Sequence, residues 1–375
     1  MVNEKPEEGI KQTRASRKRR SIPEMLTPDQ AISRSLAQVL RARKFDYADC
    51  SLEVLPDKGL AHHHVRIIGT GVIARIPKQS QLNLLAQDNL RYQAAAFERA
   101  SRGGHAPRLI DILLPDSWLP RGALLVQEII GTPPRLPMDL GAISRAMASF
   151  HALPLPIDTQ CAPLRHSPDP LKDMLDEINQ QAIFLDQACL SPISLQEIRR
   201  GLCSLTQRCE TDARPPKRLI SFDTHPGNFL MTADHSAILV DLEKARYSYP
   251  SFDLAHATLY TSTTWDTDTY AELTHEEVVA AYTAWEDAMD AATAQTTRTW
   301  HGPLRLAMWL WSITWCAKWR LLSRRASTES SAEDWSYQLS SEPLINHVRE
   351  RVDHYLSAEI VHLVWTECLT LEQAL

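Results

Sequence analysis

The chain has 375 residues, of which 44% are hydrophobic and 23% charged, so it can bury a substantial core in one large or two smaller domains. Its net charge of −6 carries no general signature of nucleic-acid binding. Seven scattered cysteines form no C-x-x-C pair, which argues against a disulfide framework or a zinc site and makes the cytoplasm the expected compartment.

Residues 1–22 are predicted to form a disordered basic tail. They carry Lys11, Arg14 and the basic run 17–20 without an apolar segment behind them, so they are not a secretory signal. A tether to nucleic acid or to an anionic membrane is the alternative. We favour the solvated tail and expect no nucleic-acid partner.

The next segment predicts a strand, a turn and a second strand. Residues 51–55 and 65–68 are short β-type runs on either side of a loop that contains Gly59. Backbone amides of this turn could lie near a phosphate, which makes Gly59 a candidate nucleotide-binding residue, with a plain hairpin as the alternative. The three histidines 62–64 are rejected as a metal site, because neighbouring strand residues point to opposite faces.

The elements that follow alternate with loops. Strands are predicted over 71–77 and 123–130, helices over 84–101 and 140–153, and an irregular proline-rich stretch over 154–170. The second half is predicted to be mostly helical, over 171–190, 194–211, 274–294 and 304–325, with a polar link over 326–334.

Residues 304–322 are the most membrane-like run. Three cations interrupt it: Arg305, Lys318 and Arg320. The uncharged part is too short to span a bilayer, so no membrane span is expected. Trp311, Trp315 and Trp319 recur every four residues and form one helical stripe. Core packing of this stripe is favoured over cation–π binding of a cationic headgroup.

The most informative segment is 219–260. It contains Asp223, then Asn228 five positions later, then Asp241 at the end of the apolar run 238–240. Two carboxylates and an amide can hold Mg²⁺ and aim a hydroxyl at a nucleotide phosphate, and phosphoryl transfer depends mainly on positioning and charge neutralisation. The spacing is that of a kinase catalytic loop followed by a metal-binding Asp. We therefore predict a metal and phosphate site, although each residue taken singly could be a turn former.

The local pattern supports this geometry. Residues 219–220 predict a short strand, and Pro226 with Gly227 makes 223–228 a loop. Residues 229–240 then have the pattern of a β-hairpin with a polar turn. Such a hairpin would bring Asn228 and Asp241 side by side.

The sequences DTHPGN (223–228) and LVDLE (239–243) resemble the catalytic and metal-binding segments of the aminoglycoside phosphotransferase and choline kinase superfamily. The continuation to residue 255 is especially similar to choline and ethanolamine kinases. The resemblance implies that Asp223 is the catalytic aspartate and that Asn228 and Asp241 hold Mg²⁺. It also implies that Glu243 supports the metal site. Asp253 would brace the catalytic loop, with a helix N-cap as the alternative.

The same resemblance implies how a nucleotide would bind. Arg75 takes the place of the family's strand cation, which contacts the α- and β-phosphates, and Lys78 is a second candidate. The helix position that is usually Glu is Gln93 here, which can hydrogen-bond Arg75 but cannot supply a charge-assisted pair. Backbone groups from Glu128 to Ile130 would bind adenine. ATP and Mg²⁺ are the expected cofactors.

The catalytic loop departs from the family pattern at two positions. Ser221 stands where the family usually has His, and Phe222 replaces the usual Gly or Asn. His225 is a candidate for phosphate or substrate contact, or a loop histidine bonded to backbone. Trp265 and Asp266 are candidate substrate residues, with a helix-capping loop as the alternative.

These expectations describe an α+β, bilobal protein-kinase-like fold. Residues 23–130 would form a small β-rich N-lobe that binds nucleotide, and residues 131–375 a large, mostly helical C-lobe that carries catalysis and substrate binding. The predicted activity is ATP- and Mg²⁺-dependent phosphorylation of a hydroxyl on a small amino alcohol or amino sugar, such as choline, ethanolamine or an aminoglycoside. A catalytically idle nucleotide-binding or scaffold protein is the alternative, favoured by Ser221 and Gln93. No sequence feature indicates the oligomeric state.

Overall fold

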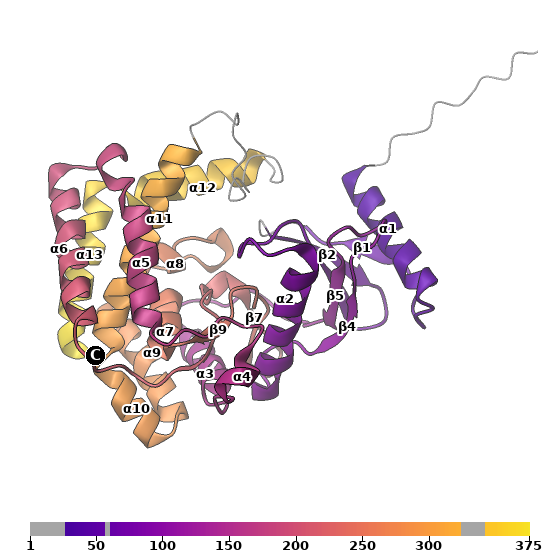
Figure 1. The fold of residues 1–375 in the computed structure, drawn as a ribbon, viewed down its shortest axis with the longest axis horizontal. Helices are drawn as coiled ribbons and strands as arrows, with labels where there is room; N and C mark the ends of the chain where they lie inside the picture. The colour runs from indigo at the N-terminus through magenta and orange to yellow at the C-terminus, as the bar shows by residue number, and fades with distance from the viewer. Residues whose placement is uncertain (1–26, 57–60, 324–341) are drawn as a thin grey trace, which may run out of the picture.

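The computed structural model describes residues 27–56, 61–323 and 342–375. A small sheet with two flanking helices lies beside a larger, mainly helical part (Figure 1). This is the predicted α+β arrangement of a β-rich N-lobe and a helical C-lobe. The tail 1–22, Gly59 and the link 326–334 lie outside the described residues, and the lobe boundary at 130/131 stays a prediction.

Five of the described strands form an antiparallel sheet in the order β1-β2-β3-β5-β4. They are β1 (Leu52–Val54), β2 (His62–Ile67), β3 (Val72–Pro77), β4 (Leu109–Leu113) and β5 (Ala123–Gln127). Alternate residues of β5 face opposite sides, so Leu125 joins the core under α1 (Pro28–Ala42) and Leu124 the core under α2 (Ala86–Ala100). The sequence patterns above predict neither α1 nor β4.

β5 leads into a segment that is bonded to the β-hairpin 229–239. The N–H of Thr132 donates to the carbonyl of Met231 at 2.9 Å, and the N–H of Met231 donates back at 2.8 Å. Gly131 is required, because a Cβ there would lie 2.7 Å from the Met231 carbonyl oxygen. Met231 belongs to β7 (Phe229–Met231), which pairs with β8 (Ala237–Leu239) as the predicted hairpin.

Helices make up most of the remaining chain. Those described are α3 (Leu140–His151), α4 (Asp158–Cys161), α5 (Pro170–Ala182), α6 (Pro192–Cys209), α7 (Pro250–Thr258), α8 (Tyr260–Thr263), α9 (His275–Ala288), α10 (Ala291–Arg298), α11 (His301–Leu322), α12 (Glu342–Tyr355) and α13 (Ala358–Ala374). Two short strands, β6 (Arg218–Ile220) and β9 (Arg246–Ser248), pair between them. The prediction of one helix over 274–294 is wrong, because the Asp290 side chain accepts from the Thr293 N–H at 2.9 Å and starts a new helix, α10.

α11 packs against α5, α7 and α13 (Figure 1). Its buried Arg305 donates to the hydroxyl and carbonyl oxygens of Thr258 at 2.7 and 3.1 Å and pairs with Glu367 of α13. These contacts tie three helices together. Within the described ranges, no helix is both long and apolar enough to cross a membrane.

Candidate active site

The loop that carries Asp223 is held by the carboxylate of Asp253 in the first turn of α7. The backbone N–H groups of Ser221 and Phe222 donate to this carboxylate at 2.8 and 2.7 Å. The Thr224 hydroxyl donates to the Asp253 carbonyl at 2.7 Å. The prediction that Asp253 braces the catalytic loop is confirmed, and its side chain does not cap α7.

A buried chain of side chains orients Asp253. The indole N–H of Trp285 donates to Nδ1 of His151 at 2.9 Å. Since an indole only donates, Nδ1 accepts, and Nε2 carries the ring proton that faces Asp253 at 3.0 Å. All three side chains are fully buried. His151 and Trp285 lie on α3 and α9, and no short motif marks either of them.

Phe222 has a backbone φ of 61°, a left-handed conformation that is costly for a residue other than glycine. The hydrogen bond that its backbone N–H donates to the Asp253 carboxylate offsets this cost. Its buried ring also packs edge-on against Phe252 and Trp311 and lies 3.7 Å from the Arg246 guanidinium carbon. The replacement of the family's Gly or Asn by Phe is therefore accommodated by aromatic packing.

Asp223 forms an ion pair with Lys244, whose Nζ lies 2.8 Å from Oδ2. Nδ1 of His256 lies 3.9 Å from Oδ1. Burial alone would raise the pKa of the Asp223 carboxyl, but Lys244, His256 and His225 hold it well below its usual range. Asp223 is therefore ionised near neutral pH, which is the state that can accept a hydrogen bond or a proton from an alcohol.

Asn228 and Asp241 meet at one end of the β7–β8 hairpin. The Val240 N–H donates to the Asn228 carbonyl at 2.9 Å, which places the two residues side by side. The Asn228 amide nitrogen donates to the Asp223 carbonyl at 2.9 Å, so the amide oxygen is the atom that can bind a cation. One carboxylate and one amide oxygen fit Mg²⁺, which takes most of its other ligands from phosphates and water.

Glu243 is buried beside this pair. Burial and the charge of Asp241 raise the pKa of Glu243 well above its ordinary value. Its carboxyl lies 3.8 Å from His62, whose pKa is lowered to about 3 by burial and by Arg75. The described part of the chain has no group of three or more His, Cys, Asp or Glu that could hold a metal ion alone. Metal binding by Glu243 therefore stays a prediction.

Arg75 links the N-lobe sheet to the segment that carries Asp241. Its guanidinium donates to the Val240 carbonyl at 2.8 Å and to Asp241 Oδ1 at 3.0 Å. Gln93, which stands where the resemblance places a Glu, accepts a hydrogen bond from His62 at 2.9 Å. Asp241 offers Arg75 a full negative charge, which an amide cannot match. The phosphate contact of Arg75 stays a prediction.

A cavity of about 1940 Å³ contains these groups. Its hinge end is lined by Gln127, Ile129 and Gly131. Two described residues of the predicted adenine segment, Glu128 and Ile130, do not line the cavity. The Glu128 N–H donates to the Gly71 carbonyl at 2.8 Å, and the Glu128 carboxylate pairs with Arg66 at 2.6 Å. Adenine binding by this backbone stays a prediction, now centred on Ile129.

Another group of lining residues is largely acidic and aromatic. This group includes the predicted substrate residues His225, Trp265 and Asp266, together with Asp173, Asp176 and Glu177 of α5 and Trp311, Trp315 and Trp319 of α11. Asp266 lies against the catalytic loop, since a Cβ at Gly227 would be 2.6 Å from its carboxylate. The Trp311 N–H donates to Glu177 at 2.7 Å. The tryptophan stripe, predicted to be core, therefore also forms the cavity wall.

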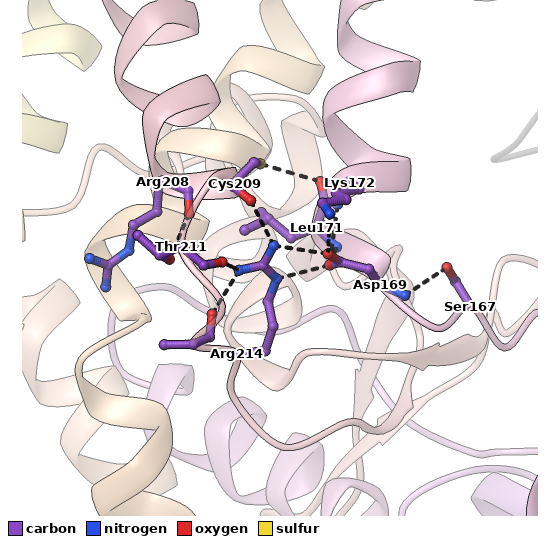
Figure 2. Close-up of polar contacts among 9 residues, drawn as sticks. Ser167, Asp169, Leu171, Lys172, Arg208, Cys209, Thr211 and Arg214 are labelled. Carbon is purple, nitrogen blue, oxygen red and sulfur yellow. Dashed lines mark hydrogen bonds and ion pairs between the residues drawn. The ribbon is translucent and has the colours of Figure 1, made fainter.

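The α5 wall of the cavity is anchored by Asp169 and Arg214 (Figure 2). The guanidinium donates to both carboxylate oxygens, at 2.9 and 2.8 Å, and this bond lowers the pKa of Asp169. Asp169 also caps α5 by accepting from the Leu171 N–H at 3.2 Å. Arg214 donates further to the Cys209 carbonyl at 2.9 Å. One ion pair thus fixes the start of α5 against the end of α6.

Comparison with known proteins identifies the family. The sequence model of the phosphotransferase enzyme family matches residues 54–291, which is more than half of the chain. The chain belongs to the phosphotransferase enzyme family. A search of curated proteins finds no significant match.

Solved structures similar to this phosphotransferase have a kinase-like fold. A choline/ethanolamine kinase family protein from Mesorhizobium loti matches with a TM-score of 0.52 at 14% identity, over 92% of this chain and 99% of that chain. Aminoglycoside 2′-phosphotransferase IIIa in its GDP complex matches with a TM-score of 0.57 at 15% identity, over 86% and 99%. Choline kinase from Cryptosporidium parvum matches with a TM-score of 0.54 at 12% identity, over 90% and 98%. At these identities the likeness shows the fold alone.

Sequence reasoning missed three side chains that line the cavity beside the predicted site residues: His62, Lys244 and His256. Lys244 follows the DLE motif directly, so its place in the sequence was an available signal. His256 lies three positions after Asp253, which puts it on the same helix as the loop brace. His62 was considered only within a rejected metal triplet, and its partners come from distant segments.

Proposed function

We propose that this phosphotransferase is a kinase that transfers the γ-phosphoryl group of ATP, with Mg²⁺, to a hydroxyl of a small amino alcohol or amino sugar. The observation that carries the proposal is an ionised Asp223 in one cavity with the Asn228–Asp241 pair and an acidic, aromatic wall. Phosphoryl transfer needs little from a protein beyond such positioning and charge stabilisation.

Each of these residues would have a separate role in the reaction. Asn228 and Asp241 would hold Mg²⁺, which neutralises phosphate charge when bound. Backbone near Ile129 would bind adenine, and Arg75 the phosphates. Asp223 would accept a hydrogen bond from the acceptor hydroxyl, aim its oxygen at the γ-phosphorus and take its proton during transfer.

A cationic acceptor suits the acidic, aromatic wall of the cavity. Three carboxylates share one helix face of α5, because Asp176 and Glu177 follow Asp173 by three and four residues. Tryptophan rings attract ammonium groups through their π faces. An amine-bearing alcohol can place its positive charge against these carboxylates, which a neutral sugar cannot do, and this favours a cationic acceptor. Only twelve positions separate Asp241 from Asp253, which leaves little room for docking a protein substrate.

The location that we propose is the cytoplasm. All seven cysteines are unpaired thiols in the structure. Several are deeply buried, and none forms a cross-link that an oxidising compartment would favour. A reducing environment matches this thiol content.

The test combines binding with turnover. Thermal shift with ATP is expected to show stabilisation that depends on Mg²⁺. ATP turnover is then measured over choline, ethanolamine, aminoglycosides and neutral sugars, and activity is expected only with cationic alcohols. Activity confined to neutral sugars would contradict the acceptor class. Mg²⁺–ATP binding without turnover on any alcohol would support the idle nucleotide-binding alternative.

A further inference from the structure

Lys244 lies beside the catalytic carboxylate on the loop between Asp241 and β9. Its ammonium is 2.8 Å from Asp223, its side chain is 20% exposed, and it lines the cavity. The carboxyl groups of Asp223, Glu243 and Asp241 line the same cavity. The ammonium of Lys244 therefore lies among the proposed base and the predicted metal ligands.

The charges around this lysine show what it could add. Three carboxylates already face the space where a triphosphate would enter: Asp223, Asp241 and Glu243. Arg75 is hydrogen-bonded to Asp241, a predicted Mg²⁺ ligand. Lys244 supplies positive charge next to Asp223 instead. Without it, the ionised Asp223 would repel the incoming phosphoryl group.

We propose that Lys244 binds the transferring phosphoryl group and holds it in line with Asp223, an inference that rests on the proposed kinase activity. An ammonium has three N–H donors, so it can hold Asp223 with one and donate to phosphoryl oxygens with the others. The transition state spreads negative charge over those oxygens, and a preorganised cation in a site sheltered from water stabilises it strongly.

The chemical step keeps Lys244 unchanged. The acceptor oxygen forms a bond to the γ-phosphorus while the bond from that phosphorus to the β–γ bridging oxygen breaks, and ADP leaves with the electron pair. The hydroxyl proton passes to Asp223 and then to water. Lys244 stays protonated and makes only hydrogen bonds, so its effect falls on the rate of transfer rather than on ATP affinity.

The test compares K244M and K244R with K217M. Lys217 is a matched control, because it is also partly buried and its Nζ donates to the Ser167 carbonyl at 2.9 Å, away from the cavity lining. Turnover is measured together with calorimetric binding of ADP and Mg²⁺, with and without fluoride. The trifluoromagnesate complex mimics the planar phosphoryl group, so its extra affinity reports phosphoryl binding without turnover.

We expect K244M to lower kcat by about 10²–10³-fold while the KM for ATP changes by less than about threefold. Fluoride should tighten ADP binding in the wild type and in K217M, partly in K244R, and little in K244M. If K244M does not fold, K244Q replaces it.

Failure of this inference can be distinguished from failure of the kinase proposal. Equal loss of ADP and ADP–fluoride affinity in K244M, or wild-type values of both with unchanged kcat, would overturn the role of Lys244. A wild-type chain that neither turns over nor forms the fluoride complex would refute the kinase proposal itself.

Discussion

Two sheltered cation–carboxylate pairs in this molecule have opposite surroundings. Arg305 is fully buried, and its guanidinium is held by Thr258 and Glu367 from two other helices. Lys244 and Asp223 are also mostly buried, but both line the cavity. The first pair joins helices and the second faces a space that a ligand can enter. Burial of an ion pair therefore does not by itself indicate a functional site. Contact with a cavity that a ligand can enter does.

The largest effects on activity are expected from substitutions in the cavity. D223A should lower turnover by at least about 10³-fold, because a positioned base is lost, while Mg²⁺–ATP binding largely survives. D241A should instead remove Mg²⁺-dependent nucleotide binding. Turnover and thermal shift with ATP measure the two effects. Wild-type activity in D223A would contradict the proposed role of Asp223.

The helix-joining pair should respond in stability rather than in chemistry. R305M is expected to destabilise the fold by about 3–5 kcal/mol, because the Glu367 carboxylate would stay largely buried but would lose its cationic partner. Urea unfolding measures this cost. The double variant R305M/E367M should recover most of it. A cost below about 1 kcal/mol for R305M would contradict the structural role assigned to this pair.

Asp253 should show an intermediate effect, because it acts on chemistry through the backbone. D253N weakens two hydrogen bonds to a charged acceptor, each worth about 1.5–3 kcal/mol, and loosens the left-handed Phe222. We expect kcat to fall by about 10–100-fold with little change in the KM for ATP. D169N is the matched control on the α5 wall and should alter the acceptor KM more than kcat. The same kinetic pattern in both variants would contradict separate roles.

The smallest effect concerns acid stability at Glu286, outside both pairs. Burial would raise its pKa, but bonds from His301 and Arg298 lower it from 4.5 to about 2. A pKa that is lower in the folded state stabilises the fold above about pH 4.5, and this contribution is lost as the pH falls toward 2. E286Q should be less stable by on the order of 1 kcal/mol at neutral pH. Thermal unfolding should show a smaller difference in stability between the wild type and E286Q at pH 3 than at pH 7.

Local sequence patterns predicted those features that local chemistry determines. The spacing of Asp223, Asn228 and Asp241 and the turn after Met231 lie within one short segment, so the hairpin follows from the sequence. The role of Asp253 followed from the family resemblance. The break between α9 and α10 was missed, because helical propensity continues through a position where the cap of Asp290 decides the structure.

Features that depend on distant segments were beyond sequence reasoning. Arg75 pairs with Asp241, 166 positions away, and Gln93 of the following helix is bonded to His62. The sequence placed Trp311 on a stripe of α11 but could not show that α5 leaves part of that stripe facing the cavity. Tertiary packing decides both outcomes.

The bond between hinge and hairpin has a consequence for nucleotide selection. The Thr132–Met231 pair continues into the Phe229–Leu239 pair and then into the bond from Val240 to Asn228. Thr132, three residues after Ile129, and the Asn228–Val240 bond therefore belong to one ladder, which fixes the spacing between the hinge and the loop that carries Asn228 and Asp241. For a nucleotide bound as proposed, that spacing sets the required length from base to terminal phosphate, so a triphosphate without a base, or a base with one phosphate, would engage only one end.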